Sequence, residues 1–330
     1  MKHKLLVTRL ILIATLFCGF LTLPIKALAV DANSADGTTT HTLSKSYVVY
    51  GAGVAKELYS KIDEVLGTDS NFQTLTSTAA DYRTYISSGS STTDAAMISS
   101  VAIAPGDPGS GVKVNIQNYN GQNNITTVTS QQYAMVAQMA GVTDVTIVVT
   151  ANRAVSGEAA LTGVYKAFAQ DGVTLNSKNT TTANNMLSAT QDAIKENSGD
   201  ATYPGKLMAA VGDTTKEISQ EKQKGNTLTA TDIKQILEEA LAKRDIDQQT
   251  SSNSITNIVN VLVNFQSAPI SSSKKYVTNI SNTINNVKNS TGNLMNKAKD
   301  WANSEAGQKL ASDAQGWFSR LIAWIQSLFN

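Results

Sequence analysis

The hydrophobic patterning of this chain is densest between residues 95 and 170, and this stretch constrains the fold more than any other. It contains a Pro/Gly-rich turn, a continuous apolar run typical of a buried strand, and two segments with helical periodicity. The expected elements are, in order, strands at 95–104 and 112–119 paired as an antiparallel hairpin, a helix at 130–140 ending at Gly141, a buried central strand at 145–149, and a helix capped by Ser156 that ends at Phe168.

Strands and helices also alternate ahead of this stretch. A strand is expected at 47–50, a helix at 54–66, a second strand at 72–76, and then a short helix capped by Ser77 or Thr78. Such alternation is typical of an α/β fold. The sequence therefore predicts an α/β domain with a mixed sheet and flanking helices, followed by an all-α C-terminal helical region.

The C-terminal half is more polar and its periodicity is helical. Helices are expected around 183–194, from Tyr203 onward, and from a Thr231-Asp232 cap to Arg244, with a linker at 245–254. After Pro269, apolar residues recur every three or four positions as far as Trp301. The predicted organisation is a signal peptide at 1–29, a flexible leader at 30–45, an α/β core domain at 46–170, a helical extension of the core at 171–250 and an amphipathic helical tail at 251–330.

The first 29 residues have the pattern of a secretory signal peptide. Basic residues in positions 2–9 precede an apolar run at 10–23, and small residues follow at Ala27 and Ala29. Cleavage after Ala29 is expected, which predicts a secreted protein associated with the cell envelope. A lipoprotein with Cys18 as the lipidated residue and an uncleaved anchor are the alternatives, but the apolar run is shorter than the roughly 20 residues that span a bilayer.

Removal of this peptide changes the charge and the chemistry of the chain. Four of the 27 basic residues lie in 1–29, which leaves 23 basic against 26 acidic residues, a net charge of −3, and argues against nucleic-acid binding. The single cysteine, Cys18, is removed as well, and His41 is the one histidine that stays. Ser-His-Asp and Cys-His catalysis and a His/Cys zinc site are therefore disfavoured, and we expect no metal and no cofactor.

Several short motifs fall within the predicted α/β domain and the helices after it. They are ISSV at 98–101, GVKV at 111–114, Tyr133, GVTD at 141–144 and SGEAALTGV at 156–164, with Asp81 and Tyr85 in TAADYRTY upstream. In order and spacing they resemble the YpuA-like family of secreted Gram-positive bacterial proteins, the domain of unknown function family 1002. The resemblance runs from about Tyr47 to Leu241 and leaves out the tail after residue 250. It implies an exported protein of a Gram-positive bacterium, but neither an activity nor catalytic residues.

One loop of the predicted α/β domain is a candidate ligand site. Ligands of open α/β sheets bind beyond the carboxyl ends of the strands, and the loop after the strand at 145–149 leads into a helix N-terminus. Its candidate residues for an anionic group or a sugar are Asn152, Arg153, Ser156 and Gly157. In the alternative interpretation, Ser156 is an ordinary helix cap, Gly157 allows close packing and Arg153 is solvated.

Two carboxylates allow an enzymatic alternative. Asp81 and Glu158 could act as the acid and base of a glycosidase, which needs two carboxyl groups on either side of the scissile bond. Nothing in the sequence brings them together.

The C-terminal segment carries the strongest functional signal. All three tryptophans lie in the last 30 residues, and from Lys274 to Asn330 there are seven basic residues against three acidic ones. A basic amphipathic helix that carries Trp is typical of attachment to an anionic membrane surface. A wall polymer, a partner helix or the chain's own helical bundle are the other surfaces it could cover. The candidate contact face consists of Trp317, Phe318, Leu321, Trp324, Ile325 and Leu328.

Two functions from different classes follow from these patterns. The favoured one is a non-enzymatic binding module of the cell envelope, held there by the C-terminal segment. The alternative is a carboxylate-based envelope hydrolase that acts on glycans or peptidoglycan. The sequence leaves the ligand and the oligomeric state open.

Overall fold

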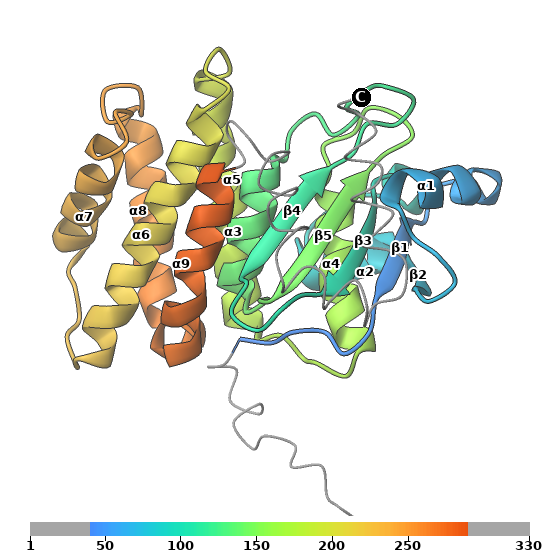
Figure 1. The fold of residues 1–330 in the computed structure, drawn as a ribbon. Coiled ribbons are helices and arrows are strands. Elements are labelled where there is room, and N and C mark those ends of the chain that lie inside the picture. The colour runs from blue at the N-terminus through green and yellow to red at the C-terminus, as the bar shows by residue number, and fades with distance from the viewer. Residues whose placement is uncertain (1–39, 290–330) are drawn as a thin grey trace, which may run out of the picture. The chain divides into compact units, whose positions relative to one another are not determined.

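The structure is a computed structural model that describes residues 40–289. Its sheet has five strands in the order β2-β1-β3-β5-β4 (Figure 1). β1 pairs in parallel with β2, and β4 pairs in parallel with β5, while β3 is antiparallel to both of its neighbours. The predicted α/β class with a mixed sheet is confirmed. The strands are β1 (Tyr47–Gly51), β2 (Gln73–Ser77), β3 (Ser100–Pro105), β4 (Val112–Ile116) and β5 (Val145–Thr150).

The predicted hairpin between 95–104 and 112–119 is wrong. β5 lies between β3 and β4, and β4 reaches it through a helical crossover rather than by a tight turn. The physical reason is the composition of β5, whose six residues are all buried. A strand that is buried on both faces is best satisfied with a neighbour on each side. β3 holds the middle of the sheet, so β5 is a buried strand but not the central one.

Alternate residues of the strands divide between two apolar clusters, one on each face of the sheet. Val48, Ala102 and Val148 pack with α1 (Tyr59–Leu66), which follows a short 3-10 helix, η2 (Lys56–Leu58). Val49 and Ile147 belong to the larger cluster on the other face, which includes residues of α3 (Ser130–Ala140) and α4 (Glu158–Gln170). The larger cluster continues into the helices that follow the sheet.

The helical region is joined to the sheet through α3. This helix contacts β4 and also packs against α5, α6 and α9. α6 passes close to two of these neighbours, because a Cβ placed on Gly212 would lie 2.7 Å from Met135 of α3 and 2.6 Å from Ile284 of α9. The remaining helices are α2 (Ala79–Tyr85), α5 (Ser177–Glu196), α6 (Tyr203–Gln223), α7 (Ala230–Ala242), α8 (Ser252–Ser267) and α9 (Lys274–Asn289), with 3-10 turns η3 (Asp94–Ala96) and η4 (Pro269–Ser272).

Several helix ends differ from the sequence-based expectation. Thr78 caps α2 and Gly141 ends α3, as predicted. The cap of α7 is Thr229 rather than Thr231, because Asp232 stands three residues after Thr229 and completes a capping box with it. α4 has no side-chain cap, since its N-cap residue is Gly157 and not Ser156. None of the helices between residues 40 and 289 combines the length and apolar character that crossing a bilayer requires.

The first part of the predicted amphipathic tail is integrated into the body. α8 packs against α5 and α7, and α9 packs against α6, α3 and β4. Ile280, Ile284 and Val287 of the apolar stripe are buried, as is Tyr276, which precedes the predicted Val277. The rest of the stripe, from Thr291, lies outside the described residues.

The last residues of the predicted leader are also packed. His41 forms a parallel bridge with Val142, and Leu43 is buried. Ser44 is tied to Asp171 at the end of α4 through its backbone N–H at 2.6 Å and its hydroxyl at 2.9 Å. The leader was expected to extend to residue 45, but residues 41–44 are packed against the body. The predicted signal peptide lies outside the described residues.

Candidate functional site

The candidate ligand loop lies where the pairing of the strands predicts. Because β3 is antiparallel to both β1 and β5, the four other strands all run in one direction and end at the same edge of the sheet. This edge carries the loop after β5, at 151–157, and the N-terminus of α2 directly after β2. In open α/β sheets this is the edge at which ligands bind.

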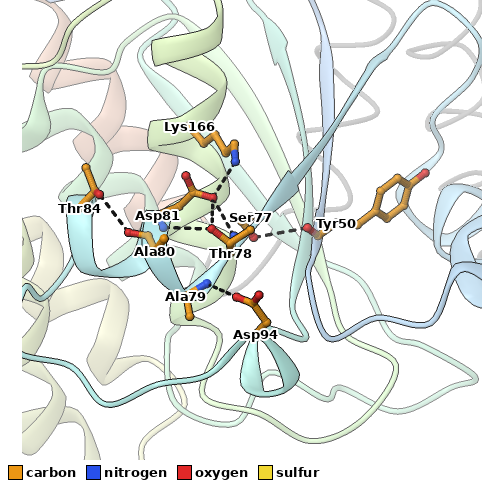
Figure 2. A network of polar contacts seen from close by, with 9 residues as sticks. All are labelled: Tyr50, Ser77, Thr78, Ala79, Ala80, Asp81, Thr84, Asp94 and Lys166. Atoms are coloured by element: carbon orange, nitrogen blue, oxygen red, sulfur yellow. Dashed lines mark hydrogen bonds and ion pairs between the residues drawn. The ribbon is translucent and has the colours of Figure 1, made fainter.

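A polar network holds the N-terminus of α2 at this edge (Figure 2). The carboxylate of Asp81 accepts hydrogen bonds from the backbone N–H of Thr78 at 2.8 Å and from its hydroxyl at 2.7 Å. The same oxygen, Oδ2, forms an ion pair of 2.6 Å with Lys166 of α4. On the other side, Asp94 accepts a hydrogen bond of 2.7 Å from the N–H of Ala79. The N–H groups of Thr78, Ala79 and Asp81 at the start of α2 are therefore partnered within the protein.

The surroundings of Asp81 fix its charge. Burial alone would raise its pKa, but the hydrogen bonds from Lys166 and Thr78 outweigh burial and hold the pKa below its ordinary value. A carboxylate that stays ionised in this way accepts hydrogen bonds and cannot serve as a general acid near neutral pH. Asp81 therefore completes the capping box of α2 with Thr78 and forms an ion pair with Lys166.

Glu158 has a separate partner on α2. Its Oε2 accepts a hydrogen bond of 2.6 Å from the hydroxyl of Tyr82, and burial together with this bond raises the pKa of Tyr82. Glu158 is the first residue of α4, whereas Lys166, which binds Asp81, is eight residues further along. Eight residues of helix correspond to about 12 Å. The two carboxylates of the hydrolase hypothesis thus lie on the packed helices α2 and α4. Their contacts involve positions of α4 that are two turns apart.

The four candidate loop residues have different environments. Arg153 is exposed and donates a hydrogen bond of 3.1 Å from Nη2 to the carbonyl of Ala95. Asn152 is half-buried, and its Oδ1 is enclosed without a hydrogen-bond partner among the described residues. Ser156 is exposed, while Gly157 is buried. Of the four candidates, Arg153 and Ser156 are therefore accessible to a ligand, and Asn152 has a side-chain oxygen without a partner among the described residues.

Gly157 is the centre of a structural contact that sequence reasoning missed. Its carbonyl accepts hydrogen bonds from the hydroxyl of Tyr133 at 2.6 Å and from that of Ser99 at 3.2 Å. Ser99 in turn accepts a hydrogen bond of 2.9 Å from the N–H of Ala160 in the first turn of α4. Ser99, Tyr133 and Gly157 all lie in the motifs that carry the family resemblance, and this was the available signal that they belong together.

A second group of motif residues meets near the start of β4. The N–H of Gly111 donates to Asp144 Oδ1 at 3.0 Å, and the N–H of Val112 donates to Thr283 of α9 at 3.0 Å. Asn286 of α9 donates to the carbonyls of Ser110 at 3.1 Å and of Val112 at 3.0 Å. β4 is an edge strand, so these side chains of α9 occupy backbone groups that the sheet leaves open.

The described residues offer little for metal chemistry. Between residues 40 and 289, no three side chains of His, Cys, Asp or Glu come together in a way that could hold a metal ion. His41 is half-buried next to α9, and burial followed by the charge of Lys275 lowers its pKa. The candidate membrane or partner face, from Trp317 to Leu328, lies outside the described residues.

Comparison with known proteins identifies a family. A family model described as a protein of unknown function, DUF1002, matches residues 50–286, and the chain therefore belongs to this family. The match includes α8 and most of α9, which the sequence resemblance had left out. The YpuA-like, Gram-positive detail of that resemblance stays a prediction. Neither a curated protein nor a solved structure matches the chain.

Proposed function

We propose that this DUF1002 protein is an exported, non-enzymatic binding protein of the cell envelope, attached to an anionic membrane surface by its C-terminal segment. The observation that carries the proposal is the composition of that segment. It gathers all three tryptophans next to a wide apolar face, and residues 290–330 carry four basic side chains against three acidic ones. Trp and Lys are the residues that favour the boundary between lipid headgroups and acyl chains.

The packing of α9 supports this assignment of the segment that follows it. The apolar residues of α9 are buried in the same cluster as α3 and α6, so the stripe up to Val287 belongs to the folded body. The apolar face at 317–328 is a separate feature of the sequence, roughly 30 residues further on. We propose that it covers a surface outside the chain.

The contacts of the two carboxylates support a binding role over hydrolysis. Asp81 is ion-paired with Lys166, and its pKa is lowered, while Glu158 is hydrogen-bonded to Tyr82. A glycosidase needs one carboxyl group that holds a proton near neutral pH. We propose instead that the loop at 151–157 presents Asn152, Arg153 and Ser156 to an envelope ligand.

Vesicle flotation tests the membrane part of the proposal. Mature protein from Val30, a truncation that lacks 302–330 and the double variant Trp317→Ala/Trp324→Ala are mixed with anionic or with neutral phospholipid vesicles. We expect the mature protein to float with anionic vesicles only, and both altered forms to stay at the bottom. The reason is that this variant loses the two largest apolar side chains of the face that enters the interface.

Two outcomes would overturn the proposal. If the truncation floats as well as the mature protein, the segment is not the attachment site. If neither form floats and the truncation unfolds at a lower temperature, the segment covers the chain's own body. Retention of the mature protein on insoluble wall polymer, without flotation, would replace the membrane by a wall polymer as the surface.

A further inference from the structure

The outward face of α9 carries lysines and no acidic residue. Its exposed positions are Lys274, Lys275, Thr278, Asn282, Asn285 and Lys288, and they follow one another at helical spacing. The buried positions, such as Ile280 and Ile284, lie on the opposite side. There is no acidic residue between Asp247 and Asp300, so neither α9 nor α8 before it contributes a carboxylate. The outward face of α9 is therefore purely basic and neutral.

The lysines at the start of this face have no acidic neighbour on their own helix. Two exposed lysines of other helices are paired within one turn, Lys61 with Glu64 at 2.9 Å and Lys234 with Glu238 at 2.6 Å. Within residues 40–289, neither Lys274 nor Lys275 forms an ion pair. A partner would be worth little at such an exposed site, but its absence leaves the full positive charge facing outward.

Acidic groups of the neighbouring elements interact with other lysines. At its start, Gln223 of α6 donates a hydrogen bond of 3.3 Å to the carbonyl of Ser273. The carboxylate of α6 closest in sequence to that contact, Glu221, is bound to Lys224 at 2.6 Å and to Asn226 at 2.7 Å. In the loop before β4, Asp107 acts on Lys113, whose pKa is lowered by burial and raised in part by Asp107 and Asp144.

The charge of Lys275 also acts on His41. Burial lowers its pKa, and the positive charge of Lys275 lowers it further. No carboxylate contributes an opposing effect. The surface at the start of α9 is therefore electropositive beside His41 as well.

We propose that this face of α9, from Lys274 to Lys288, lies against the headgroups of the same anionic membrane surface that the C-terminal segment enters. The proposal rests on the proposed function and extends it by giving the folded body an orientation. Its support is charge complementarity together with continuity, because α9 leads directly into the segment that begins at residue 290. The 14-residue separation of the two end lysines corresponds to about 21 Å along the helix, enough to reach several headgroups.

Charge reversal on α9 tests the proposal. The variant Lys274→Glu/Lys275→Glu in the mature protein is compared with Lys234→Glu/Lys243→Glu, which changes one exposed lysine of α7 and the exposed lysine at its C-cap by the same charge. Each lysine near an anionic surface changes partition about five-fold, so loss of two predicts at least a 20-fold weaker partition onto anionic vesicles. The α7 variant should lose less than about three-fold. The effect on the α9 variant should shrink as salt is raised, because salt screens exposed charges.

The outcomes separate this inference from the function on which it rests. Equal partition of the two variants, with the truncation lacking 302–330 still unable to bind, overturns the orientation and leaves the attachment intact. If the mature protein does not partition at all, the attachment and the orientation fail together. Lys288→Glu gives a second reading on the same face, and a weaker partition is expected there as well. Unfolding midpoints equal to that of the parent protein establish that the variants are folded.

Discussion

At the scale of single residues, the backbone of Gly157 explains more of the shape of the candidate loop than the side chains of the loop do. A glycine opens α4 because the chain there has a φ of +107° and the neighbouring side chains leave no room for a Cβ. A Cβ at this position would lie 2.5 Å from the hydroxyl of Tyr133 and 2.7 Å from Ile125. The same glycine presents the carbonyl that Ser99 and Tyr133 bind. The loop is thus shaped by a residue without a side chain.

We expect Gly157→Ala to destabilise the protein strongly. The positive φ costs a non-glycine residue about 1–2 kcal/mol, and forcing a methyl group into a packed site costs a further 1–3 kcal/mol. The free energy of unfolding should fall by about 2–5 kcal/mol in urea denaturation. Gly89→Ala is the matched control, because no atom lies within 4 Å of its Cβ position, and it should change stability by less than about 0.5 kcal/mol. Equal effects of the two substitutions would contradict the packing around Gly157.

At the scale of elements, α9 makes two kinds of contact within the folded body, apolar packing and hydrogen bonds. Its apolar side is buried against the helices, and its Asn and Thr side chains bind the backbone of the β4 edge. Thr283 is central to this seam, since it accepts from the N–H of Val112 and donates to Gln138 at 2.8 Å. Sequence periodicity predicted the apolar stripe of α9. It could not predict the seam, because a hydrogen bond between residues 112 and 283 depends on how two distant elements are packed.

Thr283→Val tests this seam. Valine keeps the shape of threonine but leaves the buried N–H of Val112 without a partner, which costs about 1–3 kcal/mol. We expect a corresponding loss in the free energy of unfolding and faster hydrogen exchange at the Val112 amide. Thr278→Val, on the exposed side of the same helix, should have little effect, because that hydroxyl only binds the carbonyl of Lys274 at 3.1 Å. Unchanged exchange at Val112 in Thr283→Val would show that α9 does not cover the strand edge.

At the scale of the whole molecule, the body is rich in tyrosines that folding holds in the neutral state. The pKa of Tyr47 is raised to about 12, first by burial and then by its hydrogen bond to Asp171. Burial also raises the pKa of the fully buried Tyr133 and Tyr165. The same direction holds for Tyr50, Tyr82, Tyr85, Tyr203 and Tyr276.

This arrangement predicts a loss of stability in alkali. Above pH 10 the unfolded chain releases tyrosine protons that the folded chain keeps, so the free energy of unfolding falls as pH rises. Each such tyrosine contributes about 1.4 kcal/mol per pH unit until its folded pKa is reached. We expect the unfolding midpoint to fall steeply between pH 10 and about 12, and tyrosinate absorbance to appear together with unfolding. Reversible ionisation of most tyrosines near pH 10 in the folded protein would contradict their burial.

The sequence by itself determined the features that depend on neighbouring residues. It predicted the α/β class, most strands and helices, the Thr78 cap, the end of α3 at Gly141 and the family, because these follow from local periodicity, capping patterns and short motifs. It also contains the predicted signal peptide and the Trp-bearing segment on which the proposed function rests.

Only the tertiary structure decided which distant segments meet. It placed β5 between β3 and β4, drew Ser99 and Tyr133 to the carbonyl of Gly157, and tied Asp81 to Lys166. It also brought α9 against the β4 edge and left the lysines of α9 facing outward. These pairings satisfy buried backbone and side-chain groups across more than 20 residues of chain. Local patterns carry no information about which partner a buried polar group will find, so the candidate site could be located from the sequence but its contacts could not.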